Sequence, residues 1–255
     1  MDIIQAIILG IVQGLTEFLP VSSSGHLVLF QKMFKLEEAP IFFDTLLHFA
    51  TLLAVVFYLR KEILDIFFNL KKNINLIWLL FLGTLPAVIF GLLFKDFIEA
   101  SFSSLAWLSA GFFTTALLLF ATKFLKEGLK DMQKINWKDS LLIGIFQAIS
   151  ILPSISRSGA TISSALYRNI KRDDAFKFSF LLSIPAIFGA MVLQILDFNG
   201  NKLNGGLLPN ILGFFAAAIF GFLSLKILEK MITRGKFHYF AFYCFVLGLL
   251  ILIFI

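Results

Sequence analysis

The residues of this chain that could carry out chemistry are concentrated in segment 10–27, which reads GIVQGLTEFLPVSSSGHL. It places an amide (Gln13), a carboxylate (Glu17), three successive hydroxyls and an imidazole (His26) in strongly apolar surroundings. A charged group in such surroundings is costly unless it is paired or lines a functional cavity. The segment is therefore a candidate functional site.

Gln13 and Glu17 are four residues apart, so on a helix they share one face. Glu17 could simply cap a nearby turn or pair with Arg157. Alternatively, it could be a metal ligand or the carboxylate of a phosphate site, with Gln13 as a weaker second ligand. Mg²⁺ in proteins binds through one or two carboxylates, several waters and substrate phosphate.

The turn Ser22-Ser23-Ser24-Gly25-His26 supplies hydroxyls beside an imidazole. One interpretation is a hydroxyl-rich turn that caps the next helix. The functional interpretation is that the tip of a hairpin aims hydroxyls and backbone N–H groups at one point, with His26 as general base. The base would activate either a serine or a water.

A second segment, 144–161, repeats the first and reads GIFQAISILPSISRSGAT. Four identities recur at a spacing of 134 residues: Gly10 with Gly144, Gln13 with Gln147, Ser24 with Ser158, and Gly25 with Gly159. Arg157 has no acidic neighbour in sequence, so at membrane depth it needs an anion, which could be Glu17 or a ligand phosphate. Arg157 beside Ser156, Ser158 and Thr161 at a helix start favours a phosphate site.

Asp44 and His48 are also four residues apart, near the start of an apolar stretch. Asp44 could cap a helix or add a second acidic ligand to a metal. We favour a satisfied polar pair in the protein core over a catalytic pair.

Composition defines the class of protein that must position these residues. Of the 255 residues, 59% are hydrophobic and only 15% are charged, whereas soluble domains are roughly 45–50% apolar and about 25% charged. This predicts an all-α polytopic membrane protein. The net charge of +6 lies in short loops between apolar segments, so no nucleic-acid partner is expected. The single cysteine excludes an internal disulfide.

The two segments predict re-entrant helical hairpins, at residues 3–34 and at about 139–167. Irregular backbone at membrane depth is tolerated only where protein or a watery cavity satisfies it. Membrane-spanning helices are expected at 41–59, 76–94, 103–122, 175–196, 207–228 and 237–255. Segments 82–91 and 212–221 match at six of ten positions, which supports a duplication. We therefore predict one membrane domain, 1–255, of two repeats at about 1–125 and 135–255.

Three spanning helices in each repeat would make the second repeat insert upside down, as an inverted-topology repeat. Lysines and arginines set the orientation, because cytoplasmic loops carry an excess of them. Sixteen lie in segments 60–75, 122–139, 166–177 and 229–237. The opposite connections hold only four, Lys32, Lys35, Lys95 and Lys202. Both termini and the first hairpin are thus expected to face the exterior.

Together, QGLTEFLPVSSSGH and LPSISRSGAT resemble the two motifs of the undecaprenyl-diphosphate phosphatase family, the membrane group also named for bacitracin resistance. The resemblance covers nearly the whole chain. It implies hydrolysis of undecaprenyl diphosphate to undecaprenyl phosphate and inorganic phosphate, which recycles the lipid carrier for peptidoglycan synthesis and gives bacitracin resistance. It also implies the bacterial inner membrane, a site open to the periplasm, and a divalent cation, Mg²⁺ or Ca²⁺.

The resemblance places the family's catalytic positions on Glu17, Ser22, Ser23, His26 and Arg157. Two positions depart from the family pattern. Gln13 stands at a variable acidic position, which puts a metal site of two carboxylates in doubt, and Ser154 replaces a glycine, which could stiffen the second turn. The rival hypothesis is a transporter that moves a polyprenyl phosphate lipid with the same phosphate site. A homodimer is compatible with the sequence.

Overall fold

The structure, a computed structural model, describes residues 1–36, 41–196 and 206–253, and within them it is helical with no β-strand. The helices of the first half are α1 (Ile3–Phe18), α2 (Ser23–Met33), α3 (Ile41–Tyr58), α4 (Arg60–Phe68), α5 (Leu70–Leu93), α6 (Lys95–Phe102) and α7 (Leu105–Ala121). Those of the second half are α8 (Trp137–Ile149), α9 (Arg157–Tyr167), α10 (Arg172–Leu196), α11 (Leu207–Thr233) and α12 (Phe240–Ile253). Short 3-10 turns occur at Thr122–Phe124, Met132–Lys134 and Phe237–Tyr239.

Four of the described helices are long and apolar enough to cross a membrane: α5, α7 with the turn that follows it, α10 and α11. Helix α3 passes the same test together with α4, from which it is bent by 70°. The helices α1 and α12 are apolar but shorter, and Phe254 and Ile255 at the end of the expected last span lie outside the described residues. The predicted all-α polytopic class is confirmed.

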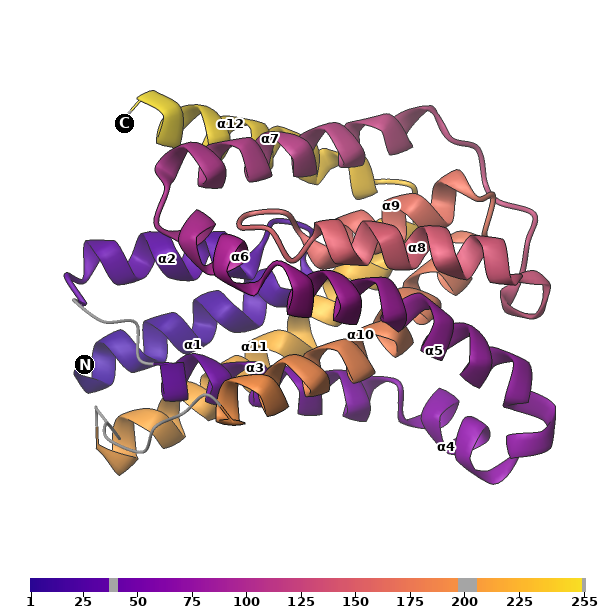
Figure 1. The fold of residues 1–255 in the computed structure, drawn as a ribbon, viewed down its shortest axis with the longest axis horizontal. Helices are drawn as coiled ribbons and strands as arrows, with labels where there is room; N and C mark the ends of the chain where they lie inside the picture. The colour runs from indigo at the N-terminus through magenta and orange to yellow at the C-terminus, as the bar shows by residue number, and fades with distance from the viewer. Residues whose placement is uncertain (37–40, 197–205, 254–255) are drawn as a thin grey trace.

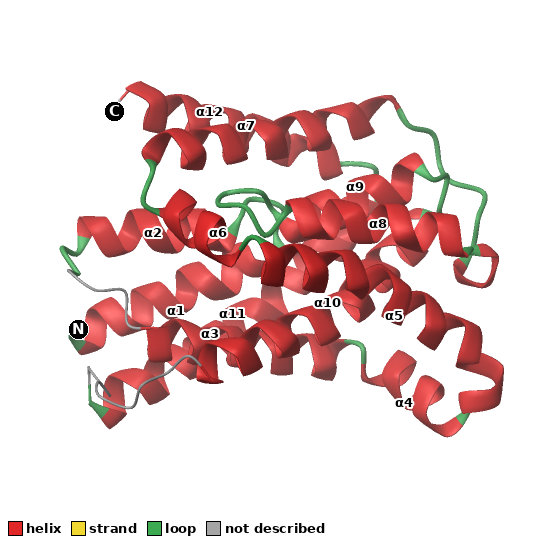
Figure 2. Cartoon of the chain, in the orientation of Figure 1, coloured by secondary structure: helices red, strands yellow, loops and turns green. Residues whose placement is uncertain are grey.

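Both hairpins lie at the centre of the fold, as Figures 1 and 2 show. Helices α1 and α8 run toward the middle from opposite ends, α2 and α9 run back, and the two turns meet between them (Figure 1). Helix α1 packs along α11 and α8 packs along α5, so each hairpin packs against a long helix of the other repeat. A Cβ on Gly10 would clash with the backbone of Gly213, and one on Gly144 with that of Gly83. Gly10 corresponds to Gly144 in the sequence repeat, and Gly83 corresponds to Gly213 in segments 82–91 and 212–221.

The duplication extends to local backbone geometry at the same spacing of 134 residues. Helix α1 begins with a capping box of Asp2 and Gln5, and α8 begins with one of Asn136 and Asp139. The residues that follow α2 and α9 also correspond, because Lys35 has φ 53° and Asn169 has φ 62°. Oppositely directed hairpins with equivalent ends are what an inverted repeat requires.

Two short helices, α4 and α6, lie in segments that we expected to be loops. Helix α4 packs Ile63 and Ile66 against the core, a spacing of three residues that the sequence analysis did not use to predict a helix. Helix α6 is only eight residues long and buries Ile98 and Ser101. The expectation of irregular loops there was wrong, and α5 begins at Leu70, six residues earlier than predicted.

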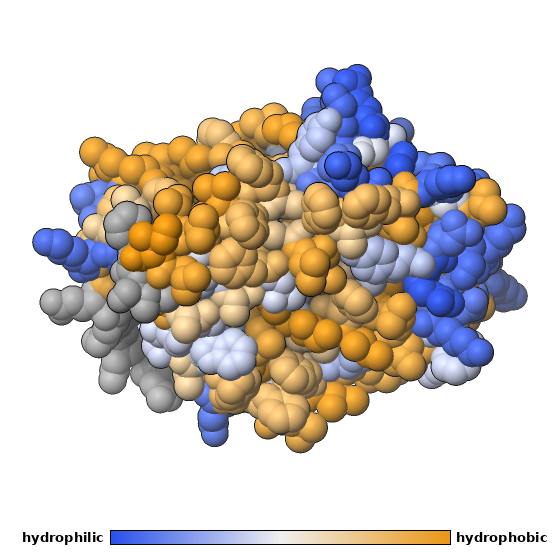
Figure 3. All heavy atoms as spheres, turned by 90° about the horizontal axis from the view of Figure 1, so that it is seen from above, coloured by the Kyte–Doolittle hydropathy of each residue, from blue (hydrophilic) through white to orange (hydrophobic). Residues whose placement is uncertain are grey.

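One end of the molecule is strongly hydrophilic, while its middle is covered by apolar side chains (Figure 3). The hydrophilic end is the one where α4 lies, and both termini lie at the opposite end (Figure 1). Lys61, Lys71, Lys72, Lys123 and Lys126 are exposed in its connections. The basic residues therefore gather at one end of the molecule, as the charges of the predicted loops indicate. Lys202, assigned to the other side, lies outside the described residues.

The open end of the second hairpin is fixed by the buried carboxylate of Asp139. Arg168 Nε donates to Oδ1 at 2.6 Å, and Lys130 Nζ lies 3.1 Å from both oxygens. Burial alone would raise the pKa of Asp139, but hydrogen bonds from Arg168, the Asn136 amide and Lys130 hold that pKa below its ordinary value. The hairpin is thus anchored at the end away from the site.

Candidate active site

The two turns place the N-termini of α2 and α9 at the centre of the protein in matching ways. Ser22 Oγ accepts the Gly25 N–H at 3.4 Å, and Ser156 Oγ accepts the Gly159 N–H at 3.1 Å. Each of these hydroxyls lies 3.2 Å from the hydroxyl two residues on, that of Ser24 or Ser158. Helix N-termini bind anions through their free N–H groups and dipoles. Two of them opening toward one point have the geometry that an anion site requires.

Glu17, in the last turn of α1, is the point where the two turns connect. Its side chain is buried, Oε1 is paired with Arg157 Nη2, and Ser23 donates to Oε2 at 2.6 Å. Ser23 and Arg157 are the first residues of α2 and α9 and are 134 positions apart. Equivalent positions of the two repeats therefore meet at one carboxylate. The pairing of Glu17 with Arg157, one of the alternatives left open by the sequence, is present.

A short hydrogen bond from a hydroxyl to a carboxylate is the arrangement of a nucleophile with its base. Ser23 is held in this way by Glu17, whereas Ser22 and Ser24 contact each other. The guanidinium of Arg157 presents further donors from a side chain that is 19% exposed. The cluster thus brings a hydroxyl, a carboxylate and a guanidinium together at two helix N-termini, a set of groups that suits transfer of a phosphoryl group.

His48 joins this cluster, and Asp44 does not. His48 Nδ1 lies 3.0 Å from Gln13 Nε2 and 3.6 Å from Glu17 Oε2. Asp44 instead accepts two hydrogen bonds of 3.0 Å from Gln31. The sequence spacing could not separate the two residues, because the contact of His48 with α1 depends on how α3 packs.

His26 lies beside the serine turn but faces away from its hydroxyls. Its Nδ1 is 2.7 Å from the carbonyl oxygen of Ser22, and its Nε2 is 2.7 Å from the hydroxyl of Tyr243 in α12. Among the described residues His26 makes no hydrogen bond to a serine hydroxyl. Tyr243 is a site residue that sequence analysis missed, since 217 positions separate it from His26.

Side chains of α7 and α10 make hydrogen bonds to the second turn and to the start of α9. Thr115 of α7 donates to the carbonyl of Ser154 at 3.1 Å and accepts the N–H of Ser156 at 3.0 Å. Thr161 is hydrogen bonded to the Arg157 carbonyl at 2.8 Å and to Ser179, so its hydroxyl turns toward α10. Thr115 and Ser179 were not identified from the sequence.

Ser154, the residue that departs from the family's glycine, has φ 62° and lies against Gly25. Its buried hydroxyl has no hydrogen-bond partner among the described residues. A positive φ is costly for a residue with a side chain, so this position is one that favours glycine. The serine therefore adds strain to the turn that carries Arg157.

The residues present suit a divalent cation only in a minimal way. No group of three His, Cys, Asp or Glu side chains in the described part of the chain could hold a metal. Glu17 supplies one carboxylate, and Gln13 Oε1 is a buried oxygen without a hydrogen-bond partner. Gln13 Nε2 donates to Glu17 Oε2 at 3.1 Å, so the two oxygens would hold a cation together only after the amide turns, with waters and substrate phosphate as the other ligands.

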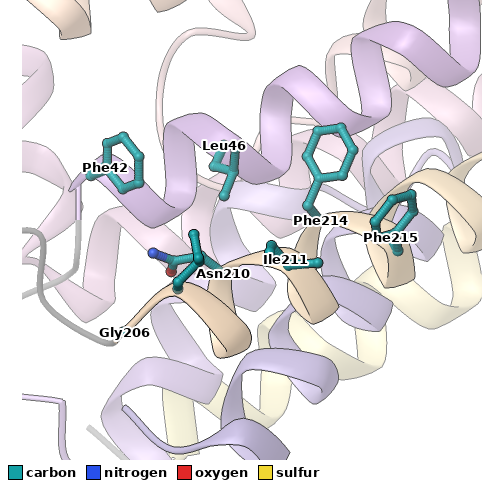
Figure 4. A pocket seen from close by; sticks show the side chains of 8 residues that line it. Phe42, Leu46, Gly206, Asn210, Ile211, Phe214 and Phe215 are labelled. Carbon is teal, nitrogen blue, oxygen red and sulfur yellow. The ribbon is translucent and has the colours of Figure 1, made fainter.

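An apolar groove of about 470 Å³ runs between α3 and α11. Figure 4 shows Phe42 and Leu46 of α3 facing Asn210, Ile211 and Phe214 of α11 across it. None of the site residues described above lines it. Its walls are of the kind that binds hydrocarbon rather than a charged head group.

The fold is that of an integral membrane protein in which two inverted hairpins bring a cluster of polar and charged side chains to the centre. Residues 6–250 match the family described as bacitracin resistance protein BacA, and the chain belongs to this family. It is 46% identical to the undecaprenyl-diphosphatase of Carboxydothermus hydrogenoformans over 257 residues, 99% of this chain and 97% of that protein. It is 46% identical to undecaprenyl-diphosphatase 3 of Bacillus cereus (strain ATCC 14579) over 99% of this chain and 97% of that protein. It is 42% identical to the undecaprenyl-diphosphatase of Methanococcus vannielii over 98% of this chain and 100% of that protein. The resemblance seen in the sequence is confirmed.

Proposed function

We propose that this protein hydrolyses undecaprenyl diphosphate to undecaprenyl phosphate and inorganic phosphate. The observation that carries the proposal is the meeting of Ser23 and Arg157 at Glu17, between two helix N-termini. The shared name of the relatives, undecaprenyl-diphosphatase, supports it. The product would re-enter peptidoglycan synthesis as lipid carrier, and removal of the diphosphate form would give bacitracin resistance.

In this mechanism Arg157 binds the diphosphate together with the N–H groups and hydroxyls of both turns. Ser23 Oγ attacks the terminal phosphorus while Glu17 takes its proton, and the bond to the bridging oxygen breaks to release undecaprenyl phosphate. Water then cleaves the phosphoserine to free inorganic phosphate. Ser22, Ser24 and Gly25 on one side, and Ser156 and Ser158 on the other, hold the phosphate oxygens at the two helix starts.

A bound Mg²⁺ or Ca²⁺ would neutralise charge on the diphosphate, with Glu17 Oε1 and Gln13 Oε1 as its protein ligands, while Glu17 Oε2 remains the base for Ser23. We expect phosphate release from undecaprenyl diphosphate by purified protein in detergent, with loss of most activity in EDTA and recovery on adding Mg²⁺ or Ca²⁺. Release that EDTA does not affect would contradict the cation. Lipid binding without any phosphate release would contradict the enzyme and support the transporter hypothesis.

The proposal places the protein in the bacterial inner membrane with the site open to the exterior. Sixteen of the 22 lysines and arginines gather in the segments of one end, which the charge rule assigns to the cytoplasm. In a Cys244→Ala background, Lys32→Cys should react with an impermeant thiol reagent on intact cells. Lys71→Cys should react only after permeabilisation, although both side chains are exposed. The reverse pattern would invert the orientation.

A further inference from the structure

His26 is buried, yet both nitrogens of its ring have a hydrogen-bond partner. The carbonyl oxygen of Ser22 can only accept, so Nδ1 carries the proton. In the neutral ring Nε2 then accepts, and the hydroxyl of Tyr243 donates to it. The Ser22 carbonyl therefore fixes which tautomer His26 adopts, the Tyr243 hydroxyl holds the ring at Nε2, and neither ring nitrogen is directed at a serine hydroxyl.

The carbonyl that His26 holds belongs to a strained residue. Ser22 has φ 67° and ψ 104°, in the half of conformational space that favours glycine. Such a backbone persists only where the surrounding contacts over-determine it. The contact from Nδ1 at 2.7 Å is short, and Ser23, the residue aimed at Glu17, comes next in the chain.

Helix α12 supports this turn at two successive residues. The ring of Tyr243 lies nearly parallel to that of His26, at 8°, and Cys244 Sγ lies 3.5 Å from the carbonyl of Pro20. From the other side the ring of Phe112 meets His26 edge-on at 5.6 Å. The side chain of His26 is thus held from both α7 and α12.

The second repeat has no counterpart of this arrangement. The position equivalent to His26, 134 residues on, is Ala160, and the second turn is held by Thr115 instead. The chain of hydrogen bonds from Tyr243 through His26 to the Ser22 carbonyl therefore supports only the turn that carries Ser23. It is not a general device for closing a hairpin.

We propose that Tyr243 is a positioning residue that acts through His26. Its hydroxyl holds the His26 ring at Nε2 so that Nδ1–H meets the Ser22 carbonyl, His26 holds that carbonyl, and the strained turn aims Ser23 at Glu17. The inference rests on the proposed function, since its purpose is to orient the nucleophile. It gives His26 the role of a clamp and leaves the role of base to Glu17.

The first test is Tyr243→Phe, which keeps the ring and removes only the hydroxyl. We expect kcat for undecaprenyl diphosphate to fall about tenfold, the effect of one lost hydrogen bond, with KM within about twofold. The ¹⁵N–¹H spectrum of histidine-labelled protein should show a weaker hydrogen bond from His26 Nδ1–H to the Ser22 carbonyl, as an upfield shift and broadening of that proton signal. Tyr239→Phe, which changes an exposed tyrosine four residues away, is the matched control and should alter neither.

The second test separates a clamp from a base. Asparagine can still donate to the Ser22 carbonyl but cannot take a proton from Ser23. His26→Asn should therefore be at least about tenfold faster than His26→Ala. It also identifies the His26 signals in the spectrum, and it tests the proposal independently if Tyr243→Phe does not fold.

Two results would overturn the inference. One is an unchanged His26 Nδ1–H signal in Tyr243→Phe, whatever its rate. The other is equal inactivity of His26→Asn and His26→Ala, which is the result a general base predicts. The spectrum does not depend on turnover. If the wild-type protein releases no phosphate, the proposed function is refuted, and the His26 Nδ1–H signal can still be measured.

Discussion

Ser23→Ala is expected to lower kcat for undecaprenyl diphosphate by at least about 10³-fold, as losses of nucleophilic residues do. Ser23 is the hydroxyl bound to the carboxylate of Glu17, at 2.6 Å, and it begins the helix whose N-terminus faces the site. Removing it leaves the electrostatics of the site intact but removes the attacking atom. The loss should therefore appear in kcat and spare KM.

Ser24→Ala is the matched control for this prediction. The Ser24 hydroxyl contacts that of Ser22 at 3.2 Å and lies one residue from the nucleophile, so its loss should cost less than about tenfold. Glu17→Gln should be as slow as Ser23→Ala, and the double variant should be no slower, because the two act as one unit. Turnover by Ser23→Ala at the wild-type rate would exclude the serine and make water the nucleophile.

The hairpins were predictable because their composition is unusual for a membrane protein. Proline, serine and glycine interrupt the apolar sequence at Pro20 and again at Pro153, and the two interruptions recur at nearly the same spacing as Gly10 and Gly144. A pattern with such an interruption cannot cross a membrane as a straight helix. Because the pattern occurs twice, it predicts two re-entrant hairpins. The repetition did not settle the partner of Arg157, for which the sequence left Glu17 and a ligand phosphate open.

Contacts between distant helices were not predictable, because they depend on rotation and packing. Tyr243 reads as one of many aromatic residues in an apolar helix, and nothing in the sequence pairs it with His26. His48 differs from Asp44 in function only because α3 turns His48 toward Glu17. A spacing of four residues states that two side chains share a face, but it does not state what that face meets.

The buried charges explain why the site could be found at all. Glu17 is 7% exposed, and an unpaired carboxylate at that depth would be strongly destabilising. Its partner Arg157 comes from the other repeat, so the ion pair joins the two hairpins. In the proposed mechanism substrate diphosphate would compete with Glu17 for the guanidinium, which would link binding of the anion to release of the carboxylate as a base.

Arg157→Lys is therefore expected to lower kcat/KM by about 10²-fold, although it preserves the positive charge. Lysine lacks the planar fork that binds two phosphate oxygens at once, and its ammonium cannot contact Glu17 and a phosphate with the same geometry. Binding of inorganic pyrophosphate, measured by calorimetry, should weaken in parallel. This readout is independent of turnover.

Arg168→Lys provides the control within the same helix. Arg157 begins α9 and Arg168 follows its last residue, and each is paired with a buried carboxylate, Glu17 or Asp139. A change at Arg168 should lower thermal stability slightly and leave kcat/KM within about twofold, because Lys130 still pairs with Asp139 at 3.1 Å. If Arg157→Lys is also near normal, Arg157 supplies only a generic charge, and recognition of the diphosphate must come from the two helix N-termini alone.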